Sequence, residues 1–97
     1  MICSFGDKRT EALYHGRLNR ETARLPQDII KAVQRKLDML EAAVSMQDLR
    51  SPPGNRLETL KGDLAGCYSI RVNARWRIVF RWEQETAANV TLMDYHG

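Results

Sequence analysis

Four arginines recur along the stretch YSIRVNARWRIVFRW, residues 68–82. Apolar and polar residues alternate here as they do in β-strands, whose side chains point to opposite faces in turn. If the aromatic side chains form the buried side, the other face carries Arg71, Arg75, Arg77 and Arg81. A guanidinium group is planar, permanently charged and matched in shape to phosphate. The pattern therefore predicts a sheet face directed at an anion, although a merely solvated arginine face is the alternative.

Two further groups could bring chemistry to this face. One is Lys61 in the tripeptide LKG, and the other is the C-terminal run Asp94, Tyr95 and His96. Histidine carries protons readily because its unperturbed pKa is about 6.5. A tyrosine can stack on a base, and an aspartate can orient a histidine or hold an arginine. Each residue also has a plain structural explanation, since a lysine often protects an edge strand and a lone terminal histidine often has no role.

These residue types fit the cleavage of RNA by its own 2′-hydroxyl. The hydroxyl must lose a proton, the 5′-oxygen must leave with one, and cations must stabilise the charge that develops on the phosphorus oxygens. From the residues alone, nucleic-acid binding is favoured more strongly than catalysis.

The distribution of charge supports an anionic partner. Residues 50–82 carry seven cations and two acids, a local charge of +5, and Arg56 is among these cations. Residues 1–49 carry eight cations and seven acids, and residues 83–97 carry three acids and no Lys or Arg, so the parts sum to the net charge of +3. A concentrated basic region is the electrostatic signature expected of a protein that binds nucleic acid.

Composition excludes several other classes. The 97 residues are 43% hydrophobic and 28% charged, which is ordinary for one globular domain. No apolar run approaches the roughly 20 residues of a membrane helix, and the N-terminus does not resemble a signal peptide, so we expect a cytoplasmic protein. Cys3 and Cys67 lack metal-binding spacing, and neither a glycine-rich phosphate loop nor a GxSxG motif occurs. No cofactor or metal is expected.

The first half of the chain predicts helices. A short strand is expected at residues 2–5, and Asp7 is expected to cap a helix over residues 8–15 that ends at Gly16. A longer helix is expected over residues 26–44, with one apolar stripe formed by Ile30, Val33, Leu37, Leu40 and Val44. Another turn at 46–50 and a break at 51–55 follow.

The second half predicts strands at residues 56–61, 67–73, 75–82 and 89–97, with a loop at 84–88. The predicted fold class is therefore α+β, with N-terminal helices packed on one face of a curved antiparallel sheet. The aromatic residues of 75–82 should face the helices, which leaves the arginine face open to solvent.

The tripeptide LKG, the block G-YSIRVN--WRI-F and the terminal DYH together resemble the HigB-type toxins, the "killer protein" branch of the RelE superfamily. The resemblance extends over nearly the whole chain and implies one RelE-like toxin domain over residues 1–97. It also implies an endonuclease that cleaves mRNA in the ribosomal A site, on the 30S subunit beside the 16S rRNA, by metal-independent 2′-hydroxyl attack. A helix-turn-helix antitoxin of the HigA type, usually encoded downstream, would neutralise it.

By position, the resemblance assigns Lys61, Arg77, Asp94, Tyr95 and His96 to the active site. Arg71 falls where more distant RelE relatives carry a catalytic lysine. We expect Arg56, Arg75 and Arg81 to attract RNA or ribosomal phosphates.

The chain departs from the family pattern at Glu58, where some HigB relatives carry a histidine three residues before the lysine of LKG. A carboxylate there could act as a base or hold an arginine. A non-catalytic RNA- or ribosome-binding module is the alternative function, and an inactive relative that only binds an antitoxin is another.

Overall fold

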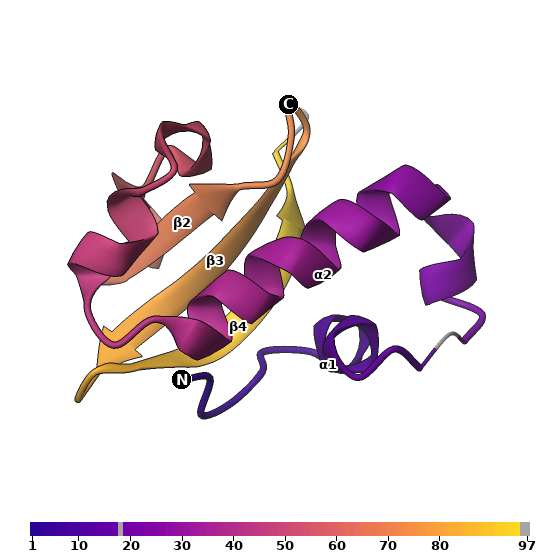
Figure 1. Cartoon of the computed structure of the whole chain (residues 1–97), viewed down its shortest axis with the longest axis horizontal. Helices are drawn as coiled ribbons and strands as arrows, with labels where there is room; N and C mark the ends of the chain where they lie inside the picture. Colours follow the sequence, from indigo (N-terminus) through magenta and orange to yellow (C-terminus); the bar gives the residue numbers. More distant parts are fainter. Residues whose placement is uncertain (18, 96–97) are drawn as a thin grey trace.

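A computed structural model describes residues 1–17 and 19–95 of the chain, and in it the helices precede the strands, as predicted (Figure 1). Helix α1, Lys8–Tyr14, begins at Asp7, whose carboxylate accepts a hydrogen bond from an amide of the first turn at 2.8 Å. Such a bond satisfies one of the backbone amides that the start of a helix leaves without a partner. The predicted start is confirmed, whereas the helix ends at Tyr14, one residue earlier than predicted, and the left-handed Gly16, at φ +71°, follows the His15 cap.

Helix α2, Gln27–Ala42, follows Pro26 and buries one apolar stripe. The stripe consists of four residues that are at most 4% exposed, namely Ile30, Val33, Leu37 and Leu40. The expectation that Val44 completes this stripe is wrong. The chain becomes extended at Ala43, so Val44 lies beyond the helix and is 67% exposed.

The segment after α2 is a chain of short turns. The predicted turn is present as a 3-10 turn, Met46–Arg50, and it buries Leu49. A second 3-10 turn, Pro53–Asn55, occupies the predicted break and leads to Arg56. No helix in the described part of the chain is long and apolar enough to span a membrane.

Four antiparallel strands form one sheet in the order β1-β2-β3-β4. Their bounds are Glu58–Thr59 for β1, Cys67–Arg71 for β2, Trp76–Glu83 for β3 and Thr86–Asp94 for β4. Strand β1 is shorter than predicted. Strand β4 begins earlier than predicted, because the turn before it needs only two residues, Gln84 and Glu85, which both have positive φ.

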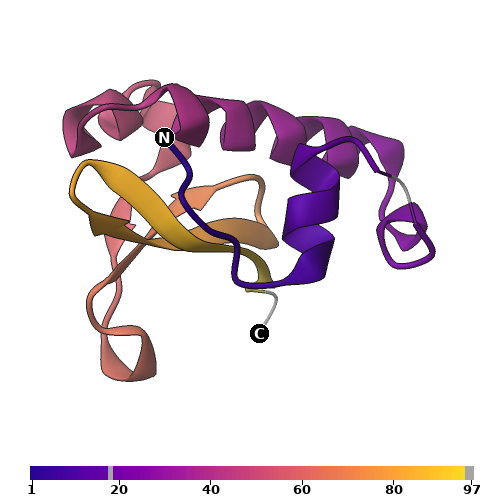
Figure 2. The same cartoon turned by 90° about the horizontal axis from the view of Figure 1, so that it is seen from below.

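The predicted strand at residues 2–5 forms only isolated bridges. Ile2 pairs with Ala87, and Phe5 pairs with Val90, both parallel to β4. The N-terminal segment therefore runs along the outer side of β4, which would otherwise end the sheet (Figure 2).

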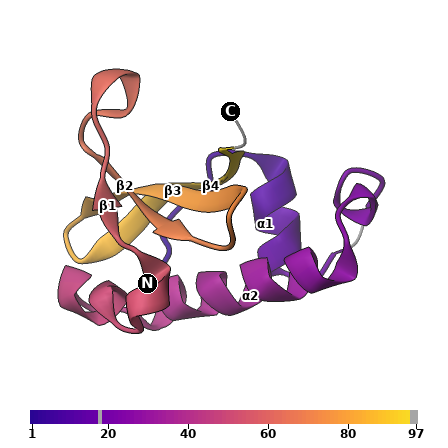
Figure 3. The same cartoon turned by 90° about the horizontal axis from the view of Figure 1, so that it is seen from above.

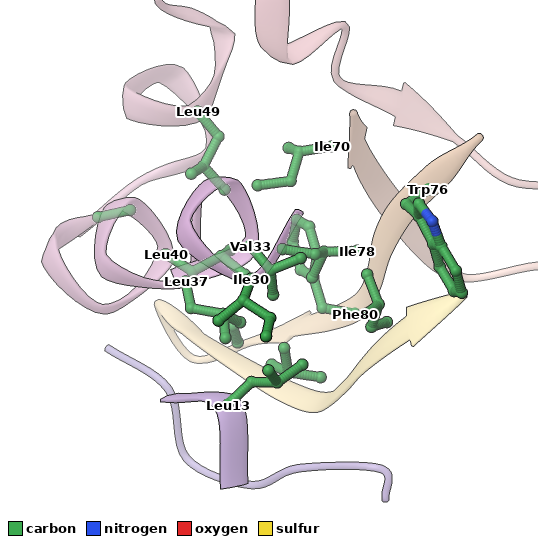
Figure 4. Packing of buried hydrophobic residues seen from close by; sticks show 14 residues of the cluster. Leu13, Ile30, Val33, Leu37, Leu40, Leu49, Ile70, Trp76, Ile78 and Phe80 are labelled. Atoms are coloured by element: carbon green, nitrogen blue, oxygen red, sulfur yellow. The ribbon is translucent and has the colours of Figure 1, made fainter. Parts of the chain in front are cut away.

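Helix α2 crosses one face of the sheet, and α1 packs beside it, which confirms the predicted α+β architecture (Figures 2 and 3). Side chains of α2 meet Ile70, Ile78 and Phe80 from the sheet in a continuous apolar cluster (Figure 4). The alternation in β3 is thus as predicted on this side. Trp76 is 8% exposed at one end of the cluster, while Trp82 is only partly buried.

Candidate active site

Arg77 is the most constrained cation on the far side of the sheet. Its Nε donates to Ser69 Oγ at 2.8 Å, and its Nη2 donates to the carbonyl oxygen of Arg56 at 2.6 Å. A longer bond of 3.4 Å joins Nη2 to the carbonyl of Ser69, and Glu58 Oε2 lies 3.9 Å from Nη2. Its Nη1 makes no hydrogen bond to any residue that the structure describes. The guanidinium is therefore held along one edge, through Nε and Nη2.

The prediction that all four arginines lie on an open face is wrong for Arg77, which is 8% exposed. Ser69 and Val79 beside it are also buried, at 0% and 3% exposed. The face is partly covered because the segment that leads into β1 places the Arg56 carbonyl on Arg77, and because the Tyr95 ring lies over it.

Strand register brings two further charged residues to Arg77. Arg71 lies directly opposite Arg77 in the β2–β3 pair, so their side chains leave the sheet on the same face. Glu58 lies opposite Ser69 in the β1–β2 pair, and 56% of its side chain is exposed. Arg71 itself is half-buried. The Glu58 carboxylate thus lies 3.9 Å from the Arg77 guanidinium, and Arg71 leaves the sheet on the same face as Arg77.

The end of β4 brings Tyr95 to the same place. The Cζ atom of Arg77 lies 6.0 Å from the centre of the Tyr95 ring, and Tyr95 is 41% exposed. The Tyr95 amide donates to the Arg75 carbonyl at 2.6 Å, which fixes this end of the chain beside the turn between β2 and β3 (Figure 1). The predicted His96 lies outside the described residues. We call Glu58, Ser69, Arg71, Arg77 and Tyr95 the Arg77 cluster.

Asp94 turns toward Arg75. Its Oδ2 accepts hydrogen bonds from Nε and Nη2 of Arg75 at 3.0 and 2.8 Å, and both side chains are substantially exposed. These hydrogen bonds and the charge of Asp94 raise the pKa of Arg75. Two of the predicted site residues, Asp94 and Arg75, therefore form an ion pair with each other.

Two predicted site residues lie toward the other end of the sheet. Lys61 follows Leu60, whose amide donates to the Cys67 carbonyl at 2.9 Å, and Cys67 lies opposite Arg81. Cys67 is four residues before Arg71 on β2, which is roughly 13 Å along a strand. Lys61 and Arg81 are both exposed, and no hydrogen bond or ion pair among the described residues links either side chain to the Arg77 cluster. The predicted basic face is thus divided into two regions.

Arg9 of α1 is a residue that sequence reasoning missed. Its Nη2 donates to the Leu92 carbonyl at 3.1 Å, and its Cζ lies 5.4 Å from the centre of the Trp76 ring. Arg75 packs against the same ring at 5.1 Å. These contacts fasten α1 to the ends of β3 and β4 that carry the Arg75–Asp94 pair. No local sequence signal could have shown the contacts of Arg9, because they join segments more than 65 residues apart.

Asn55 is a second residue that the sequence did not reveal. Its side chain is fully buried, and it accepts a hydrogen bond from Lys36 Nζ on α2. It donates to the Leu49 carbonyl at 3.2 Å and lies 3.8 Å from Met39 Sδ. Burial, together with the charge of Arg35, lowers the pKa of Lys36. Asn55 therefore ties the turn before Arg56 to the helix layer.

The cluster suits binding of a phosphate diester more than it suits binding of a metal ion. A fixed guanidinium can meet an anionic oxygen without reorganising, a tyrosine ring can stack on a base, and an exposed carboxylate can take up a proton. Within residues 1–17 and 19–95, no three His, Cys, Asp or Glu side chains are grouped as metal ligands.

Comparison with known proteins adds sequence relatives and a fold. A family model described as the RelE-like toxin of the type II toxin–antitoxin system HigB matches residues 3–96. Toxin HigB-1 of Vibrio cholerae serotype O1 is 43% identical over 96 residues, which cover 99% of this chain and 98% of the relative. Endoribonuclease HigB of Proteus vulgaris is 30% identical over 96 residues, covering 99% of this chain and 100% of the relative.

Among solved structures, the YoeB–YefM complex from Staphylococcus aureus contains a similar chain. The TM-score is 0.60 at 17% identity, and the match covers 100% of this chain and 99% of that one. At this identity the likeness shows the shared α+β fold.

Proposed function

The chain belongs to the RelE-like toxins of the type II toxin–antitoxin system HigB, and from this premise we propose that it is an endoribonuclease that cleaves mRNA on the ribosome. The observation that carries the proposal is the position of Arg77. Its guanidinium is held by Ser69 and Arg56, with the Glu58 carboxylate and the Tyr95 ring beside it. The printed name of the Proteus vulgaris relative, an endoribonuclease, supports the same activity.

In the proposed reaction, the 2′-oxygen of one nucleotide attacks the adjacent phosphorus, and the bond to the 5′-oxygen of the next nucleotide breaks. The products are a 2′,3′-cyclic phosphate and a free 5′-hydroxyl. Arg77, with Arg71 beside it, stabilises the negative charge that develops on the non-bridging oxygens. Glu58 accepts the proton of the 2′-hydroxyl, and His96 returns a proton to the leaving oxygen. Tyr95 stacks on a base next to the cleaved bond.

The remaining predicted residues are assigned to binding and orientation. Lys61, Arg56 and Arg81 contact phosphates of the mRNA or of 16S rRNA in the 30S A site. Arg75 contributes less to binding, because its guanidinium is already engaged by Asp94. The protein acts in the cytoplasm, and its antitoxin is a helix-turn-helix protein of the HigA type.

Induction of the gene in a bacterial host tests the proposal. We expect growth to stop and primer extension to reveal new mRNA 5′ ends within translated codons, whereas an empty vector gives neither. Ribosome binding with intact message would instead favour a non-catalytic binding module. Absence of both toxicity and ribosome binding would favour an inactive relative that only binds an antitoxin.

Salt dependence offers a separate prediction about binding. Affinity for RNA should fall steeply with rising salt. The slope of the logarithm of the binding constant against the logarithm of the salt concentration should be roughly −0.7 per phosphate contacted on a single strand. Arg81→Gln should reduce the slope by about one phosphate contact, whereas Arg75→Gln should change it less, because Arg75 is paired with Asp94. The measurement is a titration of fluorescent RNA at several salt concentrations. A slope that does not depend on Arg81 would remove it from the binding surface.

A further inference from the structure

Arg56 has an unusual backbone conformation for a residue with a side chain. Its φ of +43° and ψ of +58° lie in the left-handed region, where residues other than glycine are uncommon. In this conformation, its carbonyl oxygen points at Arg77 and accepts the 2.6 Å bond from Nη2. Non-glycine residues keep such a conformation only where their surroundings impose it, and they gather at functional sites.

The residue before Arg56 supplies that constraint. Asn55 is 0% exposed, and its side chain is anchored at three points, Lys36 Nζ, the Leu49 carbonyl and Met39 Sδ. Its own amide donates to the Pro52 carbonyl at 3.0 Å. Because Asn55 is fixed on both its side chain and its backbone, the direction of the next peptide group is set by the packing of α2.

The other acceptors of Arg77 do not depend on this turn. Ser69 lies in β2 and is held by strand pairing on both sides. Glu58 is 3.9 Å from Nη2 and mostly exposed, so it constrains the guanidinium weakly. The Arg56 carbonyl is therefore the acceptor whose position can be altered without changing the sheet.

We propose that Asn55 is a positioning residue for Arg77, acting through the carbonyl of Arg56, with Lys36 as its support on α2. This inference rests on the proposed endoribonuclease function. Without Asn55, the turn relaxes and Nη2 loses its shortest bond. A buried cation with an unsatisfied donor then turns toward the Glu58 carboxylate and away from the position that a phosphate would occupy.

The test compares Asn55→Ala with Thr22→Val. Thr22 is also a fully buried polar residue, but it lies in the α1–α2 connection, where its hydroxyl is hydrogen-bonded to the backbone of Asn19. In single-turnover cleavage on programmed ribosomes, Asn55→Ala should lower the cleavage rate constant roughly ten-fold. That is the lower end of what losing a partner that orients a functional side chain costs in metal sites. Ribosome affinity should stay unchanged. Both variants should lower Tm, because each removes a buried polar group, but Thr22→Val should leave the rate constant at its wild-type value.

A readout independent of activity is the NMR signal of the Arg77 side-chain Nε–H. Its chemical shift and its protection from exchange should change in Asn55→Ala and stay unchanged in Thr22→Val. If Asn55→Ala is poorly folded, Lys36→Met removes the support while keeping Asn55, and it should shift the same signal in the same direction by a smaller amount.

Wild-type cleavage rates and an unchanged Arg77 signal in Asn55→Ala would overturn the positioning role. If both variants were folded and Thr22→Val lost as much activity as Asn55→Ala, the positioning role would also be overturned. If the wild-type protein cleaves no RNA, the proposed function fails instead, and the NMR signal still decides whether Asn55 orients Arg77.

Discussion

Replacing Arg77 with alanine should lower the rate constant for mRNA cleavage by on the order of 10²–10³-fold, the usual effect of removing one preorganised donor from an active site. The large effect is expected because the guanidinium is already oriented by Ser69 and Arg56 before substrate arrives. Single-turnover cleavage of mRNA on purified ribosomes measures the rate constant directly, and growth arrest should disappear in the same variant.

Arg77→Lys is the informative companion variant. Lysine keeps the charge but cannot donate to Ser69 Oγ and the Arg56 carbonyl while also presenting a planar pair of donors. We therefore expect Arg77→Lys to be nearly as slow as Arg77→Ala, with ribosome affinity little changed. If Arg77→Lys were close to wild type, Arg77 would act as a diffuse charge and not as an oriented group.

Phe80→Ala should lower the free energy of unfolding by about 3–5 kcal/mol, the range for removing a large aromatic side chain from a core. Phe80 is 1% exposed at the centre of β3, between Tyr68 and Trp82, with ring centres 6.1 and 6.4 Å away. Because small domains are stable by only about 5–15 kcal/mol, this loss is a large fraction of the total. Urea unfolding followed by tryptophan fluorescence gives the measurement.

Val44→Ala is the matched control for Phe80→Ala, since Val44 is apolar but 67% exposed. Its effect should lie within about 0.5 kcal/mol, as for other exposed positions. A loss of more than 2 kcal/mol at Val44 would mean that it is covered in solution. A loss below 1 kcal/mol at Phe80 would contradict the packing of the sheet on α2.

Periodicity was sufficient to predict the buried layer of the fold. The spacing of three and four in α2 and of two in β3 placed Leu37, Leu40 and Phe80 correctly. This spacing is sufficient because the apolar face of a helix or strand is buried away from water whichever element packs on it. The pattern could not show that Arg77 is buried. That depends on the segment before β1 folding over the far side of the sheet, which no alternation within β3 records.

The acceptors of Arg77 were also hidden from sequence reasoning, for a physical reason. One is a backbone carbonyl, which every residue possesses, and its direction depends on the left-handed conformation of Arg56. Another is Ser69, whose strand face was predictable but whose partner was not. Residue types indicated which side chains could do chemistry, while long-range packing decided which of them meet.

The pairing of Ile2 and Phe5 with Ala87 and Val90 has a consequence for how the protein is made. These contacts join positions about 85 residues apart in the chain, and contacts so distant in sequence form late because a long loop must close first. On a translating ribosome, β3 has no neighbour on one side until β4 has left the exit tunnel. The Arg77 cluster likewise lacks Tyr95 until then. The complete sheet and the complete Arg77 cluster therefore form only after β4 and Tyr95 have been synthesised.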